Sequence, residues 1–444
     1  MKQNRAREQT DARQERIQRG HDQRQRLSRS KLAELSPRKP AFDPIQYLLN
    51  AVEGRVPRLL PIKYTRMSAS PFAFFRGAVA IMAADLGRQP HTGLTVQLCG
   101  DAHIQNLGSF ETPDGRVVFD INDFDETIPG PWEWDVKRMA TSIVLAGLES
   151  NHRRSGCADA SEAFVDSYCR NIGQLADQPV LIAARHLIHR LQKAQPVSAA
   201  LRQAARANPL ELLSKYAERG PNGHARFKKI ESSLWRLHGP VRRDVIGALP
   251  LYRESLPPER LHLFDFFHPV DVAFKVVGTG SVGLRDHIVL MEGNGPRDPL
   301  FLQIKQEVAS AYVPYLKGRV YENQGRRVVE AQRRIQPVSD LLLGWTRIGE
   351  HDYLVRQLND HKVSLDLQQL RGEGLESLAE IAGELLARGH ARSGDALAIK
   401  SYIGSSAKVV SAIAKYAMNY SELTEADFVA FQKAIKSERL KVAA

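Results

Sequence analysis

Two neighbouring stretches, "GDAHIQNLGSF" (residues 100–110) and "FDINDFDET" (119–127), carry the strongest indication of the fold. Between short apolar runs they gather six polar side chains: Asp101, His103, Asn106, Asp120, Asp123 and Asp125. Asp and Asn are depleted in strands, and Asp is rarely buried without a partner, so this concentration requires an explanation. Two explanations are open: turn chemistry at the ends of strands and oxygen ligands for Mg²⁺.

The spacing of these residues fits phosphoryl transfer from ATP. That reaction needs a carboxylate near the acceptor and oxygen ligands that hold Mg²⁺ against the phosphates. In kinase-type sites an Asn metal ligand follows the catalytic Asp in one loop, and a second Asp arrives after the next hairpin. Asp101 and Asn106 are five residues apart after a predicted strand at 94–101, and Asp123 ends the next predicted strand, 115–123. One loop can therefore direct Asp101 and Asn106 into a single cleft.

The first stretch resembles the G-D-x-H-x-x-N loop of aminoglycoside and choline phosphotransferases, which are distant relatives of protein kinases. In that group the metal-binding Asp opens a D-[FW]-[DG] motif, and a further Asp follows a G-x-P turn. Here Asp123 and Asp135 are twelve residues apart, with Pro131 between them. Cys99 departs from the pattern, because relatives usually have a loop-bracing His at that position.

This resemblance implies a role for each residue of the acidic window. Asp101 would orient or deprotonate an acceptor hydroxyl, and Asn106 and Asp123 would hold Mg²⁺. The twelve-residue spacing favours Asp123 over Asp120 as the principal metal ligand. Asp120 and Asp125 stay as further metal candidates.

A glycine-rich loop lies far downstream, within "VVGTGSVGLRDHIVLMEG" (276–293). A strand-like run follows it, whereas a Rossmann fingerprint must open a helix. A strand–loop–strand hairpin is instead typical of the lid over ATP phosphates in kinases, where glycines let backbone N–H groups approach the ligand. The residues assigned to nucleotide binding are Gly278, Gly280, Ser281 and Gly283.

The next predicted strand, "LFLQIK", ends in Lys305, which resembles the V-A-I-K lysine that contacts the α- and β-phosphates. Such a lysine needs a carboxylate on the next long helix. Glu330 in "RVVEAQR" is the predicted partner, and Glu322 is the second choice. An exposed strand end for Lys305 and a solvated helix face for Glu330 are the structural alternatives.

The order of these motifs predicts a circular permutation. Kinases run from the glycine loop through Lys and Glu to the catalytic Asp, Asn and metal Asp, whereas this chain has the last three first. Permutation is acceptable because contacts, rather than chain order, hold a fold together. The helix that normally precedes the catalytic loop should then lie near the carboxyl end, and 378–395 resembles the "LLARLHA" helix of the same phosphotransferases. Its "HARSGD" end is predicted to be a helix terminus, since Lys400 rather than Asn stands five residues after Asp395.

Taken whole, residues 45 to 440 resemble the bacterial family of domain of unknown function 2252. The segments that carry the resemblance are "SPFAFFRG", "CGDAHIQNLG", "FDINDFDETIPGPWEWDVKR", "RVVEAQR" and "HARSGD". Within these segments Arg76, His103, Lys137 and Arg138 are candidate contacts to phosphate or acceptor anions. Ion pairs with Asp135 and its neighbours are the equal alternative for the three basic residues.

Charge and composition narrow the class of protein. Residues 1–40 carry a net +7 of the chain's +12, so the rest is not a basic module. This Gln-rich leader is expected to be a solvated helix or a disordered tail, and nucleic acid would bind only weakly through it. The cysteines (Cys99, Cys157 and Cys169) lack metal-ligand spacing, which favours a reducing, cytoplasmic setting. The sequence has no apolar signal segment at its amino terminus and no apolar run of ~18 residues. Neither export nor a membrane span is therefore expected.

The sequence therefore predicts an α+β protein: a two-lobed, circularly permuted protein-kinase-like fold. The expected parts are the leader (1–40), a helical lobe with both acidic loops (41–267), a β-rich nucleotide-binding lobe (268–362) and C-terminal helices that complete the helical lobe (363–444). Helices are expected to dominate from residue 133 to about residue 247. The expected activity is an ATP- and Mg²⁺-dependent phosphotransferase acting on a hydroxyl-bearing small molecule or protein. The alternatives are a nucleotide-binding pseudokinase or adenylyl-transferring relative, and a basic nucleic-acid adaptor.

Overall fold

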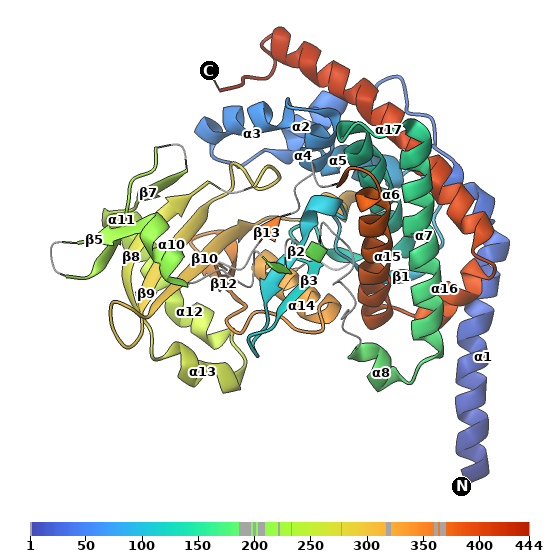
Figure 1. Ribbon diagram of the computed structural model, residues 1–444, viewed down its shortest axis with the longest axis horizontal. Helices are drawn as coiled ribbons and strands as arrows, with labels where there is room; N and C mark the ends of the chain where they lie inside the picture. Colours follow the sequence, from blue (N-terminus) through green and yellow to red (C-terminus); the bar gives the residue numbers. More distant parts are fainter. Residues whose placement is uncertain are drawn as a thin grey trace.

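The chain is a mixed α+β protein in which a sheet lies at one side and long helices lie at the other (Figure 1). The computed structural model describes the following residues: 2–185, 197–198, 201–202, 209–220, 223–231, 233–276, 278–316, 321–358, 363–364 and 370–443. The mixed class predicted from the sequence is confirmed.

The helices and strands are as follows. The helices are α1 (Lys2–Arg26), α2 (Pro44–Ala51), α3 (Leu60–Met67), α4 (Pro71–Gly77), α5 (Val79–Leu86), α6 (Trp132–Glu149), α7 (Arg154–Asp177), α8 (Val180–Ala184), α10 (Pro209–Tyr216), α11 (Gly239–Gly247), α12 (Leu249–Glu254), α13 (Pro258–Phe264), α14 (Gln324–Ile335), α15 (Gly374–Ser393), α16 (Ala396–Ile403) and α17 (Ala407–Lys436). The strands are β1 (Thr95–Leu98), β2 (Leu107–Glu111), β3 (Val117–Ile121), β4 (Ile128–Pro131), β5 (Ala217–Arg219), β6 (Ala225–Phe227), β7 (Leu234–Arg236), β8 (His268–Lys275), β9 (Asp286–Glu292), β10 (Pro299–Glu307), β11 (Gly344–Ile348), β12 (His351–Gln357) and β13 (Val363–Ser364).

The largest sheet has six antiparallel strands in the order β11-β12-β10-β9-β8-β7. Every residue of β9 is buried, because α11 to α13 cover one face of the sheet and the β5–β6 hairpin packs on the other. Strands covered on both faces are near-continuous apolar runs, as "HIVLM" is. The predicted strand–glycine loop–strand unit is the β8–β9 hairpin. Strands β11 and β12 form a second hairpin of this sheet.

The expectation that helices dominate up to residue 247 is wrong for one segment. Between residues 217 and 236 the structure has three short strands, and β7 forms an edge of the six-stranded sheet. Each is three residues long, which is too short to give a recognisable alternation of apolar and polar residues. Their pairing comes from tertiary contacts with β8 and with each other.

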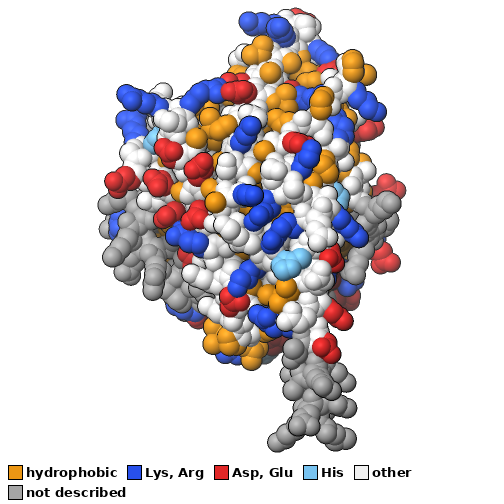
Figure 2. Space-filling view, turned by 90° about the vertical axis from the view of Figure 1, so that its right-hand side faces the viewer, with side chains coloured by type: hydrophobic (Ala, Val, Ile, Leu, Met, Phe, Trp, Pro, Cys, Tyr) orange, Lys and Arg blue, Asp and Glu red, His pale blue; other side chains and the backbone are white. Residues whose placement is uncertain are grey.

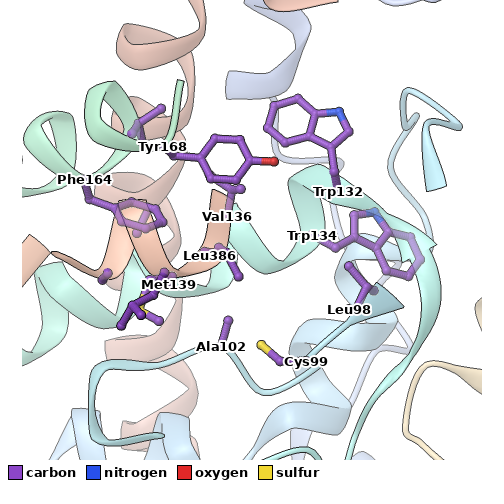
Figure 3. Close-up of a cluster of buried hydrophobic side chains, with 14 of the residues drawn as sticks. Leu98, Cys99, Ala102, Trp132, Trp134, Val136, Met139, Phe164, Tyr168 and Leu386 are labelled. Atoms are coloured by element: carbon purple, nitrogen blue, oxygen red, sulfur yellow. The ribbon is translucent and has the colours of Figure 1, made fainter. Parts of the chain in front are cut away.

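Helix α6 is the centre of the helical part, and every residue from Trp132 to Gly147 is buried. It packs against α7, α15, α17 and β1. Figure 3 shows its Trp132 beside Tyr168 of α7, and the two rings stack with centroids 5.5 Å apart. Cys99 and Ala102 belong to the same cluster of buried hydrophobic side chains as Trp132 and Tyr168 (Figure 3). The loop that holds Asp101 is thus attached to a rigid core.

The basic leader is a helix docked on α16. The guanidinium of Arg16 lies 2.8 Å from the carboxylate of Asp395, and Arg24 donates to the carbonyl of Tyr402 over 2.7 Å. A Cβ at Gly20 would come within 2.3 Å of the Ala398 carbonyl oxygen, so the two helices touch through backbone at this point. On the face built by the long helices, Lys and Arg share the surface with Asp, Glu and hydrophobic side chains (Figure 2).

Two findings concern the predicted setting of the protein. In the part of the chain that the structure describes, no helix has both the length and the apolar character to span a bilayer. The cysteines Cys99, Cys157 and Cys169 are buried free thiols.

Candidate active site

A cavity of about 910 Å³ lies where the sheet, the glycine loop and the two acidic loops meet. Ligand sites are typically clefts of this size with a few convergent polar groups. The predicted site residues that line it are Arg76, Asp101, His103, Asn106, Asp123, Asp125, Gly278, Gly280, Ser281 and Lys305. The structure therefore brings together motifs that are far apart in the sequence: Lys305 contacts Asp125, which lies 180 positions before it.

The loop after β1 is held by the carboxylate of Asp135, at the first turn of α6. The backbone N–H groups of Cys99 and Gly100 donate to it over 2.7 and 3.0 Å. Gly100 has φ +84°, and a Cβ there would lie 2.1 Å from the carbonyl oxygen of Glu126. Only glycine accommodates both the backbone angle and this close approach. The two acidic loops consequently pack directly on each other.

Asp101 is fixed by the buried side chain of Arg138, whose Nε donates to Asp101 Oδ1 over 2.7 Å. Arg138 also donates to the carbonyl of Phe75 over 3.1 Å, which ties α4 to the same point. His103 Nε2 lies 3.6 Å from Asp101 Oδ2. Burial lowers the pKa of His103 to about 4, so the imidazole is neutral at pH 7 and does not compete with Arg138 as a cation.

Asn106 ends the short 3-10 helix η3 (Ile104–Asn106). Its side-chain amide donates to the backbone carbonyl of Asp101 over 2.9 Å, which leaves its carbonyl oxygen as the side-chain atom suited to a metal ion. The β2–β3 hairpin then pairs Leu107 with Ile121. This register places Asp123 two residues beyond the end of β3, next to the start of the hairpin.

Lys305 on β10 contacts the second acidic loop. Its ammonium group bonds to both carboxylate oxygens of Asp125 and lies 3.8 Å from Asp123 Oδ1. Burial lowers the pKa of Lys305, but Asp123 and Asp125 more than offset this, so its pKa is raised. Burial and the neighbouring Asp123 raise the pKa of Asp125 despite Lys305. Two carboxylates this close favour a bound cation.

Ser281 connects the glycine loop to the same carboxylate, since its hydroxyl lies 3.1 Å from Asp125 Oδ2. Among the described residues, no group of three or more His, Cys, Asp or Glu side chains is arranged to hold a metal ion. Mg²⁺ commonly binds through only one or two carboxylates and completes its octahedron with water and phosphate oxygens. Asn106 and Asp123 fit that partial donor set.

Several predicted residues lie elsewhere. Asp120 is buried against α15, where Arg388 pairs with it, so it faces away from the cavity. Glu330 is exposed and pairs with Arg326 on the same helix over 2.7 Å, and Glu322 is also exposed. The structure therefore does not bring either glutamate to Lys305, whose carboxylate partner is Asp125.

Three further predicted residues lie outside the cavity lining and contact other parts of the protein. Lys137 donates to Gln89 Oε1 over 3.0 Å inside the helical part, and Arg138 contacts Asp101 rather than open space. Gly283 has φ +95°, and its carbonyl accepts from the N–H of Val56. Lys137, Arg138 and Gly283 do not line the cavity.

Sequence reasoning missed Arg327, a buried residue of α14. Its guanidinium donates to the backbone carbonyls of Asp125 and Val308, each over 2.8 Å, and so joins the acidic loop to the end of β10. A signal was present: Arg327 lies four and eight residues before Ala331 and Ile335, on the apolar stripe of the helix. A cation at such a position is buried only with partners.

The glycine loop has two further cations that were not predicted. The ammonium group of Lys63 donates to the carbonyls of Thr279 and Gly280 over 3.1 and 3.2 Å, and Arg55 donates to the Gly280 carbonyl over 2.7 Å. Lys63 is buried, which lowers its pKa. Both residues belong to the segment between α2 and α4, which precedes the loop of Asp101 in the chain.

Asp286 is a buried carboxylate directly across the strand pair from Lys305. Its Oδ2 accepts from Gln303 over 2.7 Å, and its Oδ1 has no hydrogen-bond partner among the described residues. Burial raises the pKa of Asp286 to about 7, although Lys305 and Arg356 oppose this. The folded state thus retains a proton that the unfolded chain, with a pKa of about 3.9, gives up.

Stability should consequently fall as the pH rises from about 4 to above 7, because the unfolded state binds fewer protons in that window. Replacing Asp286 by Asn should remove this contribution and raise the free energy of unfolding at pH 8 by about 1–2 kcal/mol, since an unpaired amide offsets part of the gain. Chemical unfolding at pH 5 and pH 8 measures it, with the exposed Asp159→Asn as control. Equal destabilisation at both pH values would contradict the protonated carboxyl.

The fold and the cavity define an α+β protein with a polar cleft formed by two acidic loops, a glycine loop and a lysine at a strand end. The chain belongs to a family described as "uncharacterized protein conserved in bacteria" (DUF2252), whose model matches residues 55–434. No curated protein and no solved structure matches the chain.

Proposed function

We propose that the protein is an ATP- and Mg²⁺-dependent phosphotransferase with a two-lobed, circularly permuted kinase-like fold. One observation carries the proposal: the predicted catalytic and metal residues share a cavity with the glycine loop and Lys305. Turn chemistry would explain single carboxylates at strand ends, but it gives no reason for Lys305 and Ser281 to meet Asp125 from 180 and 156 positions away.

The proposed roles follow from the contacts. Backbone N–H groups of the glycine loop would cover the phosphates, and Lys305 would exchange Asp125 for phosphate oxygens. Asn106 and Asp123 would hold Mg²⁺, which supplies charge neutralisation at the phosphates. Asp101, held in place by Arg138, would orient or deprotonate the acceptor hydroxyl.

The packing of the chain ends supports the permutation. Helix α15 lies beside β1, and Ser393 Oγ accepts from the N–H of Gln97 over 3.1 Å. A Cβ at Gly394 would meet the carbonyl of Thr95 at 2.9 Å. A C-terminal helix thus packs against the strand that leads into the catalytic loop, as a permuted kinase requires.

A second candidate is nucleotide binding without phosphoryl transfer, or transfer of the adenylyl group. The observation in its favour is that the buried guanidinium of Arg138 occupies one oxygen of Asp101, which also suits a structural carboxylate. Label from the α-phosphate of ATP on a protein acceptor would indicate adenylyl transfer. The contacts of the leader do not support the nucleic-acid adaptor alternative, because its Arg16 and Arg24 contact Asp395 and Tyr402 at α16.

Calorimetric titration of ATP with and without Mg²⁺ tests the proposed site. Lys305→Ala should weaken ATP binding about tenfold or more, because a charge-assisted bond to phosphate is lost. Asp123→Ala should retain binding but lose its dependence on Mg²⁺. Lys408, exposed on α17, provides the control: Lys408→Ala should bind like the wild type.

The contradictory result is equally clear. If the wild type takes up no ATP, ADP or GTP at millimolar concentrations, the phosphotransferase proposal and the nucleotide-binding alternative both fail. If Lys305→Ala and Lys408→Ala bind ATP equally, the nucleotide does not lie at the end of β10.

A further inference from the structure

Arg76, at the last turn of α4, differs from the other arginines around the cavity. Arg138 donates to the carboxylate of Asp101, and Arg327 donates to the backbone carbonyls of Thr127, Asp125 and Val308. For Arg76, no hydrogen bond or ion pair with a described residue is found, and its buried Nε has no acceptor. The ring of Phe72 lies 5.9 Å from its guanidinium carbon. A partly buried cation that makes no hydrogen bond to an anion is costly.

The position of Arg76 indicates which anion it could receive. Its backbone carbonyl lies 3.9 Å from the place a Cβ would occupy on Gly280, at the tip of the glycine loop. Burial lowers the pKa of Arg76, and the negative charges of Asp101, Glu149 and Asp123 act against this. Arg76 also lines the same cavity as Asp101, Asp123 and Gly280, so it shares that space with both proposed reaction carboxylates and with the loop that would cover the phosphates. The phosphate nearest Asp101 and Asp123 in such a site is the one that is transferred.

Neighbouring contacts hold Arg76 in this place. Arg138 bonds to the carbonyl of Phe75, the preceding residue, and also to Asp101. Lys63 and Arg55 fix the glycine loop through its carbonyls, so the segment that contains Arg76 and the loop form one wall of the cavity. A guanidinium presented this way provides a planar fork of donors that matches phosphate oxygens.

We propose that Arg76 binds the terminal phosphate of the nucleotide, as a second cationic phosphate ligand beside Lys305. This inference rests on the proposed function and adds a residue that the kinase pattern of glycine loop, Lys, Asp, Asn and Asp does not contain. The same guanidinium chemistry would also suit an anionic group on the acceptor. The two sources differ in whether Arg76 distinguishes ATP from ADP in the absence of any acceptor.

The experiment compares ATP and ADP affinities by calorimetry, with Mg²⁺ and no acceptor, in wild type, Arg76→Met, Arg76→Lys and Lys305→Ala. Arg76→Met should weaken ATP binding about ten- to a hundredfold with ADP affinity little changed, and Arg76→Lys should be intermediate because it keeps the charge but loses the fork. Lys305→Ala should weaken both nucleotides. Arg153, exposed before α7, gives the control: Arg153→Met should match the wild type.

Each other outcome overturns the inference. Equal losses for ATP and ADP in Arg76→Met would place its effect on the fold or on the other phosphates, and unchanged affinities would assign Arg76 to the acceptor. If Arg76→Met does not fold, Arg76→Lys provides the test. An unaltered ratio of ATP affinity to ADP affinity in Arg76→Lys would contradict a contact that depends on the guanidinium fork. Absence of nucleotide binding in the wild type is a different result, which removes the proposed function itself.

Discussion

Replacing Asp101 by Asn is expected to slow the hydrolysis of Mg²⁺–ATP to ADP and phosphate, in which water takes the place of the acceptor hydroxyl, about a hundred- to ten-thousandfold, the range attributed to a positioned general base. The amide keeps the shape of the carboxylate but cannot take a proton from the attacking oxygen. ATP affinity should change little, because Asp101 would contact the acceptor rather than the nucleotide. Steady-state phosphate release and calorimetric titration measure the two quantities separately.

Loss of folding must be separated from loss of chemistry in this variant. Asp101→Asn leaves the buried Arg138 without its carboxylate, so rates are compared well below the measured melting temperature. Asp159→Asn makes the same chemical change at an exposed site of α7 and should be neutral. Equal rates in the wild type and Asp101→Asn would exclude Asp101 as the base and favour nucleotide binding without transfer.

The second large effect concerns the ion pair between Arg388 and Asp120, both of which are buried. Arg388→Met should lower the free energy of unfolding by about 3–5 kcal/mol, the cost of leaving one member of a buried pair alone. Burial already raises the pKa of Asp120 despite Arg388, so the variant should take up a proton on folding. Chemical unfolding monitored by circular dichroism gives the size of the loss.

A double-mutant cycle tests the structural role of this pair. Arg388→Met together with Asp120→Asn should recover part of the loss, because no unpaired charge stays buried. The exposed pair Arg116–Asp114 is the control, and Arg116→Met should leave the unfolding midpoint unchanged. If Asp120 were instead a metal ligand, Asp120→Asn would abolish the Mg²⁺ dependence of ATP binding, and the cycle would show no coupling.

Much of the candidate site was predictable because its motifs are local. The spacing of Asp101 and Asn106, the strand before them and the hairpin before Asp123 each depend on a few consecutive residues. The strand–glycine loop–strand unit and the position of Lys305 at a strand end depend on alternation and on turn residues. These features appear in the structure as the sequence indicated.

The interaction partners of the charged residues were harder to predict from the sequence. For Asp120 the sequence left a metal ligand and a turn carboxylate as alternatives, and it could not show an ion pair, because a strand residue faces one side or the other according to its register. The register of β2 with β3 and the packing of α15 decided it. The same holds for α14, where Glu330 has a favourable spacing in sequence but lies on the solvent side while Arg327 faces inward.

The sequence by itself therefore determined the mixed α+β class, the family and the residue types that meet in the cavity. Only the tertiary structure decided that Lys305 pairs with Asp125 rather than with Glu330, that Lys63 and Arg55 hold the glycine loop, and that the Nε of Arg76 has no hydrogen-bond acceptor among the described residues. The physical reason is the sequence distance between the contacting residues. Strands and turns follow from neighbouring residues, whereas the contacts of Lys305 with Asp125 and of Lys63 with the Thr279 carbonyl join residues 180 and 216 positions apart. Such contacts exist only after the helices and the sheet have packed.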